Sequence, residues 1–478
     1  MKITMGLEQK EEKKETKSGS DLHQYLATIT GTIVIVCTGM HFGWPSPSLP
    51  QLLDESSHIP MTNADGSWVA VMPCMGAAVG CFMAVATVDR IGRKISMLIT
   101  SPLYFIAWIM VAFSNSVAIL HSARFLAGIA DGIAFTALPI YLGEIARSAI
   151  RGLLGSFIPV TTILGFLLIN IIGSMFDITY AALISALVPI VHFCTFVFMP
   201  ESPYFLLIRN KPDSARKSLR TFRGTDDVEL ELTRLADAVR EEQESSGSLL
   251  DLFRVRSNRK ACFIIMGIRA VQQCSGTTAI TFYAKTIFDE AGSNMSSSHA
   301  AIIYFSIQLI VATLASILVD KTGRRPLLIF SIIGSGFALA SEGIYIYLKN
   351  YTEIDVSELD WVPIMSLLTY VVIFNLGMGT IPVLLLGELF PTNVKAFALC
   401  LADIYFGVIV TIVSKFFQIM KDDFGMHVPF FVFTSFCAIG LVFIVYYVPE
   451  TKGKTLEEIQ TYLRGEEKKL EQFDCTKC

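Results

Sequence analysis

Long apolar stretches recur along the chain and are separated by short polar connections. A helix needs about 20 apolar residues to cross the hydrocarbon core of a bilayer. Twelve segments of this kind can be marked, at residues 26–44, 67–88, 95–114, 118–142, 153–176, 179–199, 260–288, 299–319, 326–348, 361–387, 396–420 and 428–448. The pattern therefore predicts an all-α membrane protein with twelve transmembrane helices.

The composition supports this class and excludes others. Hydrophobic residues make up 53% of the 478 residues and charged residues only 17%, whereas soluble domains average about 25% charged residues. The 38 basic residues are balanced by 42 acidic ones, so there is no overall positive field of the kind that holds a nucleic-acid backbone. We expect a chain embedded in the lipid bilayer, with no nucleic-acid partner.

Residue types that carry catalysis or bind metals form no recognisable pattern. Eight of the ten cysteines lie singly inside apolar runs and are typical of small buried hydrophobic residues. Cys475 and Cys478 form a terminal pair without further cysteine or histidine partners. Neither a grouped nucleophile and base nor a nucleotide-binding loop is present. We therefore expect no enzyme activity, no cofactor and no metal.

Lysine and arginine are distributed unevenly among the connections. Even-numbered connections carry them, as at Arg93 and Lys94, while odd-numbered connections hold almost none. By the positive-inside bias, both termini are cytoplasmic. The two acceptor triplets for N-glycosylation, at Asn294 and Asn350, then fall in external loops. We expect a multi-pass plasma-membrane protein with possible glycosylation at these two asparagines.

One long charged connection divides six segments from six. Its apolar residues between 230 and 239 have helical spacing, which predicts short amphipathic helices. The predicted organisation is a cytoplasmic tail at 1–25, a six-helix half at 26–199, a helical linker at 200–258, a second six-helix half at 259–448 and a cytoplasmic tail at 449–478.

Three short motifs occur once in each half at equivalent places. They indicate duplication of a six-helix unit, with a substrate site between the halves near the membrane midplane. Their acids and cations can form charge-assisted bonds that act as a cytoplasmic gate; the alternative is that they only anchor the topology. The matched residues are Asp89, Arg93, Glu144, Arg151 and Glu201 in the first half and Asp320, Arg324, Glu388, Lys395 and Glu450 in the second.

Neutral polar side chains lie at mid-depth in the second half. Gln272, Gln273 and Thr278 belong to the seventh segment, Gln308 to the eighth and Asn375 to the tenth. Carboxamides both donate and accept hydrogen bonds, which suits a neutral hydroxylated solute. The alternative for any one of them is a hydrogen bond that joins two helices. We interpret these five residues as candidate substrate ligands.

Ionisable residues inside the predicted spans form a separate group. Arg124 and Asp131 are seven residues apart in the fourth segment, so they lie on one helix face and can pair directly or through water. Glu342 and Asp403 have no partner that the sequence identifies. Charges in the membrane are costly and often functional. Both a proton relay and structural pairing remain open.

Several longer motifs resemble the sugar porter family of the major facilitator superfamily over essentially the whole chain. Within that family the stretch 43–50 and the Ser67-Trp68 pair look most like the insect trehalose and hexose facilitators. The resemblance implies the major facilitator fold, with two pseudo-symmetric six-helix halves. The motifs are Asp89–Lys94, Glu144 with Arg151-Gly152, Pro200–Leu206, Gln272-Gln273 with Ser275-Gly276, Phe282-Tyr283, Asp320–Arg325, Gly387–Pro391 and Pro449–Gly453.

The resemblance also implies which positions contact sugar. The family's glutamine pair is kept as Gln272 and Gln273, whereas other positions differ. Thr278 and Gln308 replace two asparagines of the family pattern, Asn375 stands at an acidic position, and residues at the family's tryptophan positions have changed, as at Val383. The resemblance therefore implies transport more directly than it implies a particular sugar.

The resemblance also bears on whether transport is coupled to protons. Proton symporters of the family carry an aspartate in the first span, and Pro45 stands at that position here. We therefore expect a monomeric uniporter for trehalose or a hexose that works by alternating access. A proton-coupled carrier using Asp131, a carrier of another neutral polyol or organic solute, and a sugar sensor that does not transport remain alternatives.

Overall fold

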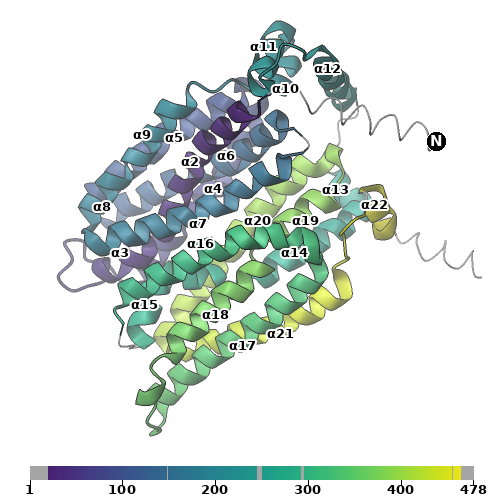
Figure 1. Cartoon of the computed structure of the whole chain (residues 1–478). Coiled ribbons are helices and arrows are strands. Elements are labelled where there is room, and N and C mark those ends of the chain that lie inside the picture. The colour runs from purple at the N-terminus through teal and green to yellow at the C-terminus, as the bar shows by residue number, and fades with distance from the viewer. Residues whose placement is uncertain (1–19, 148, 245–249, 292–294, 455, 465–478) are drawn as a thin grey trace, which may run out of the picture.

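The computed structural model describes residues 20–147, 149–244, 250–291, 295–454 and 456–464. Every regular element within these residues is a helix. Eleven helical segments within these residues are long and apolar enough to cross a membrane, and three of them consist of two consecutive helices. The helices form two bundles that lie side by side (Figure 1).

The first bundle contains six passes. Its sixth pass is divided into two short helices, and its first pass continues beyond Trp44 into a further helix. The helices are α2 (Leu22–Gly43), α3 (Pro45–Leu52), α4 (Asn63–Ile91), α5 (Arg93–Ala112), α6 (Val117–Ile145), α7 (Arg151–Met175), α8 (Ile178–Ser185) and α9 (Leu187–Phe196).

The second bundle repeats this arrangement. A short 3₁₀ helix, Ser357–Leu359, lies in the connection after its third pass. The helices are α14 (Arg256–Cys274), α15 (Thr277–Ala291), α16 (Ser297–Thr322), α17 (Arg324–Tyr351), α18 (Val362–Leu376), α19 (Ile381–Leu389), α20 (Thr392–Phe424) and α21 (His427–Tyr447).

The predicted seventh pass accounts for the difference between twelve predicted spans and eleven candidates. It consists of α14 and α15, which are separated at Ser275 and Gly276, and neither helix alone satisfies the length and hydropathy of a span. Figure 1 shows α14 near one end of the molecule and α15 near the other. The two helices together therefore follow the full length of the second bundle.

Short helices between and after the bundles gather at one end of the molecule, which we call the linker end (Figure 1). Four of them lie between residues 200 and 258, and one follows the second bundle. Arg223 attaches them to the first bundle because its guanidinium donates a hydrogen bond to the Ile145 carbonyl at 2.8 Å. The helices are α10 (Pro203–Ile208), α11 (Pro212–Arg223), α12 (Glu229–Glu244), α13 (Asp251–Arg254) and α22 (Leu456–Arg464).

The first pass begins earlier and ends later than the sequence predicted. The helix starts at Leu22, inside the predicted tail 1–25, and resumes after Trp44 at Pro45. A proline at the first position of a helix loses no hydrogen bond and already has the required φ. The proline-rich stretch therefore starts α3, where the sequence pattern had indicated the end of a span.

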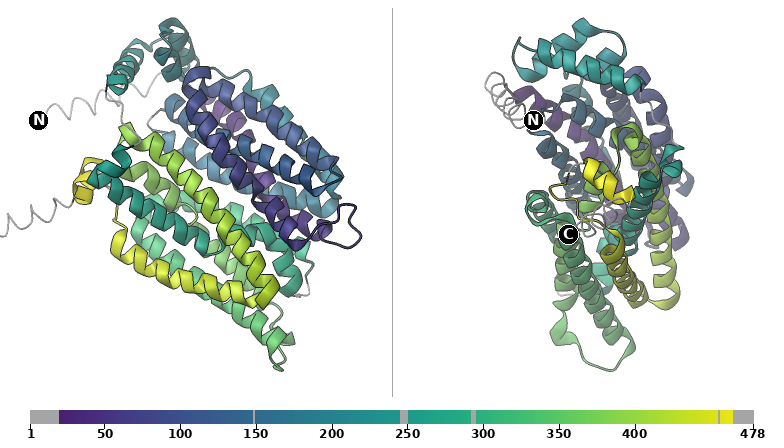
Figure 2. Two further views of the ribbon diagram at one scale, coloured as in Figure 1. Left: turned by 180° about the vertical axis from the view of Figure 1, so that it is seen from behind. Right: turned by 90° about the vertical axis from the view of Figure 1, so that its right-hand side faces the viewer.

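Each bundle has its own hydrophobic core, and the bundles meet mainly along three pairs of helices, with a smaller contact between α2 and α15. α4 packs against α20, α7 against α16, and α3 against α15. Four first-bundle residues, Leu49, Ala70, Val71 and Cys74, belong to the core of the second bundle. All four lie on α3 or in the first half of α4, away from the linker end (Figures 1 and 2).

Candidate functional site

The repeated motifs of the first half meet at the linker end. Arg93, at the start of α5, forms salt bridges with Asp89 at 2.7 Å and with Glu144 at 2.8 Å. The Ser202 hydroxyl also donates to Glu144. A buried arginine is therefore matched by two carboxylates, and motifs separated by more than 100 residues form one network.

Glu201 caps the first turn of α5. Its carboxylate accepts hydrogen bonds from the backbone N–H groups of Lys94 at 3.1 Å and Ser202 at 2.9 Å. Burial raises the pKa of Glu201, while these N–H donors act to lower it. The turn needs a glycine, because Gly92 has a φ of +105° and its counterpart Gly323 a φ of +103°.

The second half repeats the arginine–glutamate pair and the capping glutamate of this network. Arg324 pairs with Glu388 at 2.9 Å, and the Thr451 hydroxyl donates to Glu388 at 2.5 Å. Glu450 accepts from the backbone N–H groups of Arg324 and Arg325, each at 3.0 Å. Burial acts to raise the pKa of Glu450, but the backbone donors outweigh it and lower that pKa.

Two residues of the predicted gate lie outside these networks. Lys395 donates to the Gly387 carbonyl at 3.1 Å, and the exposed Arg151 forms no salt bridge with the described residues. Burial lowers the pKa of Lys395, and the positive charge of Arg151, from the other half, lowers it further. The side chain of Asp320 lies outside the described part of the structure.

Both networks connect helices of a single half. The spacing of the motifs could not show this, because the same residue types could equally have bridged the two halves. A Cβ atom added at Gly143, Gly152 or Gly155 would meet no other atom within 4 Å. These glycines lie at the end of α6 and the start of α7, so the linker end is open at that place.

The two halves contact each other at the opposite end. Lys415 of α20 donates to the Ser67 hydroxyl at 2.6 Å and to the Ala64 carbonyl at 3.2 Å, both at the start of α4. Its ammonium group also lies 3.9 Å from the centre of the Trp68 ring. With α3 packed on α15, this end of the molecule is closed.

The predicted glutamine pair is buried beside the two helix breaks of the second half. The Gln272 amide donates to the Met378 carbonyl, in the break between α18 and α19, at 2.7 Å. The Gln273 oxygen accepts from the Thr278 hydroxyl at 2.6 Å. The amide nitrogen of Gln273 has no hydrogen-bond partner among the described residues, so it can donate to a bound molecule.

The other two candidate ligands lie on neighbouring helices. Asn375 uses its amide nitrogen to donate to the Val371 carbonyl at 2.7 Å within α18. Gln308 lies on α16, which packs against α18, and its buried side-chain oxygen has no partner among the described residues. Gln273 therefore offers a donor on α14, and Gln308 carries an unpaired acceptor on α16.

Sequence reasoning missed Arg269 of α14. Its guanidinium donates to the Gln272 oxygen at 3.1 Å, lies 4.0 Å from the Asp403 carboxylate and stacks 5.1 Å from the centre of the Phe406 ring. Asp403, for which the sequence identified no partner, therefore has one. The available signal was the spacing of three residues between Arg269 and Gln272, which places both on one helix face.

The ionisable residues of the first half do not form a direct pair. Arg124 donates to the carbonyls of His41 at 2.6 Å and Val69 at 3.2 Å. Asp131 accepts from the Tyr104 hydroxyl at 2.6 Å, and its second oxygen has no partner. Arg124 and Asp131 therefore each have their own partners. One partner of Arg124 is His41, which the sequence analysis did not identify.

The remaining candidates are placed individually. Glu342 is buried in α17, and neither of its carboxylate oxygens has a hydrogen-bond partner among the described residues. Asn350 is exposed near the end of α17, so a glycan could reach it. Asn294, Cys475 and Cys478 lie outside the described residues.

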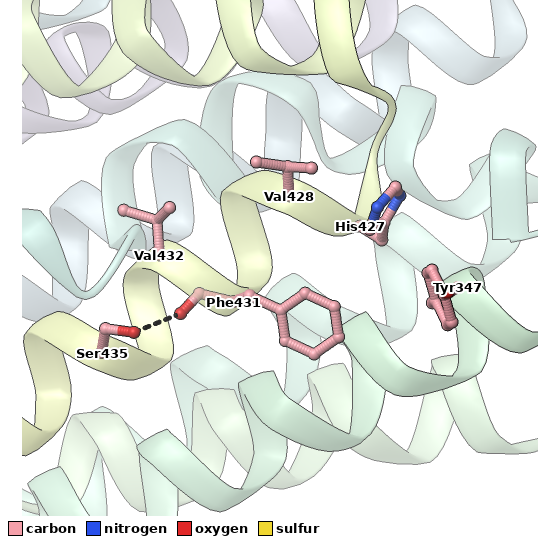
Figure 3. A pocket seen from close by; sticks show the side chains of 6 residues that line it. All are labelled: Tyr347, His427, Val428, Phe431, Val432 and Ser435. Atoms are coloured by element: carbon pink, nitrogen blue, oxygen red, sulfur yellow. Dashed lines mark hydrogen bonds between the residues drawn. The ribbon is translucent and has the colours of Figure 1, made fainter.

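A groove of about 350 Å³ lies between α17 and α21 (Figure 3). It is lined mainly by apolar side chains, and its Ser435 hydroxyl donates to the Phe431 carbonyl of its own helix. None of the candidate substrate ligands lines it. The groove is therefore separate from the glutamine site.

Two pseudo-symmetric bundles, with matching ion-pair networks at one end and a polar site at helix breaks, define a multi-pass membrane carrier of the major facilitator type. A family model described as "Sugar (and other) transporter" matches residues 8–463. The chain belongs to this family, which consists of transporters and not enzymes.

Relatives with curated names support the same assignment. The chain is 33% identical over 452 residues to the facilitated trehalose transporter Tret1 of Anopheles gambiae, a match that covers 94% of this chain and 57% of that protein. It is 32% identical to Tret1 of Culex quinquefasciatus, with 94% and 87% covered. The chain thus spans little more than half the length of some of these relatives.

Solved structures share the fold. The proton:xylose symporter XylE bound to 6-bromo-6-deoxy-D-glucose matches with a TM-score of 0.75 and 23% identity over 92% of this chain and 99% of that one. An inward-open structure of XylE from E. coli matches with a TM-score of 0.73 and 23% identity, over 92% and 98%. At this identity the likeness concerns the fold.

Proposed function

We propose that the protein is a facilitative transporter that carries trehalose or a hexose across the plasma membrane by alternating access. The observation that carries this proposal is the buried carboxamide pair at the helix breaks of a sugar transporter fold. Gln273 keeps a free donor and Gln308 a free acceptor, which complement the hydroxyl groups of a neutral sugar. The curated names of the relatives favour trehalose as the first sugar to test.

The conformation fits one state of such a cycle. The distribution of lysine and arginine supports a cytoplasmic location for the linker end and for both termini. Contacts of Lys415 with Ser67 close the opposite end, while Gly143 and Gly152 face open space at the linker end. We infer an inward-facing state from which the solute leaves toward the cytoplasm.

In this proposal the ion-pair networks serve the cytoplasmic gate indirectly, because they hold each half rigid. Glu144 and Glu388 each hold an arginine at the start of a neighbouring helix, and these bonds are made while the linker end is open. The networks therefore hold the helix ends of each half together while the two halves rotate relative to each other. The proposed halves are residues 26–199 and 259–448, and the proposed functional unit is a monomer.

Uptake by proteoliposomes tests the proposal. The purified chain is reconstituted and its uptake of labelled trehalose, glucose, other hexoses and polyols is measured, with protein-free liposomes as the control. We expect saturable uptake of trehalose or of a hexose that stops when the concentrations inside and outside are equal. Absence of uptake for every sugar and polyol, with correctly inserted protein, would contradict sugar transport.

Proton coupling through Asp131 is a second candidate function. Asp131 is buried and has one carboxylate oxygen without a partner, and such groups in membrane helices often carry protons. Pro45 and the carbonyl partners of Arg124 favour uniport. If an imposed pH gradient drives accumulation that Asp131→Asn abolishes, the symport candidate replaces uniport.

A further inference from the structure

A buried arginine and a half-buried aspartate lie directly beside the glutamine pair. We propose that Arg269 and Asp403 form a charged subsite that binds hydroxyl groups of the transported solute and sets its preference for neutral over charged sugars. This inference rests on the proposed function and extends it to the class of substrate. It adds two ligands that neither the sequence pattern nor the family motifs indicate.

The geometry of the pair leaves room for a hydroxyl group. The guanidinium nitrogen and the carboxylate oxygen are 4.0 Å apart, which is longer than a hydrogen bond of about 3 Å. A hydroxyl placed between the two groups can accept from Arg269 and donate to Asp403, because an alcohol does both. The ion pair is therefore incomplete by itself and becomes satisfied when a sugar bridges it.

Arg269 also lacks hydrogen-bond partners for part of its guanidinium group. Its side chain is only 8% exposed, and its Nε group is buried without a hydrogen-bond partner. One of its terminal nitrogens donates to Gln272 at 3.1 Å, and the Phe406 ring lies against its face. The guanidinium is thus held in place by Gln272 and Phe406 with part of its donor capacity unused.

Asp403 is the accessible member of the pair and faces the boundary between the halves. Its side chain is 34% exposed. Gly407 lies one turn further along α20 on the same helix face, and an added Cβ there would be 3.3 Å from the Cys74 carbonyl of α4. The subsite therefore lies where α20 meets the other half, the region expected to hold the solute of such a carrier.

The charges predict selectivity. Together Arg269 and Asp403 are neutral, so a neutral sugar bridges them without leaving an uncompensated charge. Removing one partner leaves the other as an unpaired buried charge, which favours a ligand of opposite charge. Asp403→Asn should therefore favour sugar acids, and Arg269→Gln should favour protonated amino sugars.

The test measures competition by charged sugars in proteoliposomes of the full chain. Uptake of labelled trehalose is inhibited with glucose, glucuronate or glucosamine at neutral pH. The quantity compared is the inhibition constant of each charged sugar divided by that of glucose. We expect this ratio for glucuronate to be about tenfold lower or more in Asp403→Asn than in the wild type. The ratio for glucosamine should fall by a similar factor in Arg269→Gln. Glu342→Gln, a buried carboxylate of the same half, is the matched control and should keep the wild-type ratios.

Four outcomes decide the inference. Opposite shifts in the two single variants support it, whereas wild-type ratios in both folded variants overturn it. If the single variants do not fold, the double variant Arg269→Gln with Asp403→Asn removes both charges. A folded double variant that retains wild-type affinity for neutral sugar shows that the pair only joins α14 to α20, and one with weakened affinity supports the subsite.

A binding measurement separates this inference from the transport proposal. The melting temperatures of the same purified proteins are recorded with each of the three sugars. If the wild type is stabilised by neutral sugar but takes up none, the transport proposal fails and the charge-dependent shifts still test the subsite. If no sugar changes the melting temperature of any variant, the subsite is overturned.

Discussion

Single residues at the start of α5 and α17 explain why the two halves share their motifs. Glu201 and Glu450 bind backbone N–H groups at the first turns of these helices, where a negative charge interacts favourably with the helix dipole. Gly92 and Gly323 let the chain turn tightly beside them. The motifs are therefore structural units that fix how neighbouring helices begin.

Replacing either capping glutamate should destabilise the protein without removing its binding site. We expect Glu201→Gln and Glu450→Gln each to lower the free energy of unfolding by about 1–2 kcal/mol, because the charge and one acceptor are lost. Thermal unfolding in detergent measures this. Glu55→Gln, an exposed glutamate between α3 and α4, serves as the control, and an equal effect in that variant would refute the capping role.

The two glutamines should differ when truncated. Gln273→Ala removes a free amide donor and releases only the Thr278 hydroxyl, so we expect an increase in KM equivalent to about 1–3 kcal/mol with a small fall in melting temperature. Gln272→Ala releases both the Met378 carbonyl and Arg269, so it should lower stability more. Uptake kinetics and unfolding of both variants measure the difference. Unchanged KM in both would remove the glutamine pair from the site.

Residue types were predictable at these sites, but their partners were not. Repetition in the sequence was enough to identify Glu144 and Glu388 as important, because matched acids in two halves are unexpected for topology alone. Only the folded arrangement shows that each bonds an arginine of its own half. Arg269 was missed because a single arginine within an apolar run gives no sign of its distant partner Asp403.

At the scale of helices, breaks position the polar groups. Ser275 and Gly276 divide the seventh pass, and residues 377–380 divide the tenth. The Met378 carbonyl freed by the second break is the acceptor for Gln272. Freed backbone groups at membrane depth are tolerated where they find a partner or line a cavity, so both breaks belong to the site.

Gly276 should be intolerant of substitution. It has a φ of +83°, and an added Cβ would collide with the Phe433 ring, so Gly276→Ala combines backbone strain with a clash. We expect a loss of about 2 kcal/mol or more in the free energy of unfolding, measured by thermal melting. Gly453→Ala, at a φ of +72° with open space around it, should cost less. Equal losses would mean that packing against Phe433 is unimportant.

Most helices were predictable because long apolar runs leave few alternatives in a membrane. The predicted segment 118–142 corresponds to α6 (Val117–Ile145), and 153–176 corresponds to α7 (Arg151–Met175). Hydropathy says less about the first and seventh passes. Pro45 begins a helix there instead of ending one, and the break at Gly276 depends on a left-handed backbone conformation that hydropathy does not record.

For the whole molecule, the networks at the linker end should affect turnover more than the balance between inward-facing and outward-facing states. Each network lies within one half and is formed while the linker end is open. Each charge-assisted bond contributes about 1.5–3 kcal/mol, so Glu144→Gln and Glu388→Gln should lower turnover in protein that still folds and reaches the membrane, with unchanged labelling of an external cysteine. Normal turnover would mean that these residues only anchor the topology.

Arg151→Gln provides the contrast. Arg151 and Lys395 are like charges from opposite halves that interact at the linker end, and removing one relieves repulsion that opposes closure of that end. We expect a small change in the labelling of the external cysteine toward the open-outside pattern, since exposed charge interactions contribute about 1 kcal/mol or less. A change toward the closed-outside pattern would contradict this repulsion between the halves.

The fold class followed from the pattern of apolar segments, whereas the conformational state did not. Both states of a carrier contain the same helices, so the sequence does not distinguish them. The contact of Lys415 with Ser67 and the open space at Gly152 distinguish them in the structure. Substrate choice likewise depends on how separate polar groups are brought together in three dimensions.

The most direct test of facilitated sugar transport is uptake of labelled trehalose and glucose by proteoliposomes with and without an imposed pH gradient. The uniport account predicts that the internal concentration of the transported sugar rises to the external concentration and stops there, with or without the gradient. Accumulation above the external concentration when the gradient is present would contradict uniport, and absence of any saturable uptake would contradict transport itself.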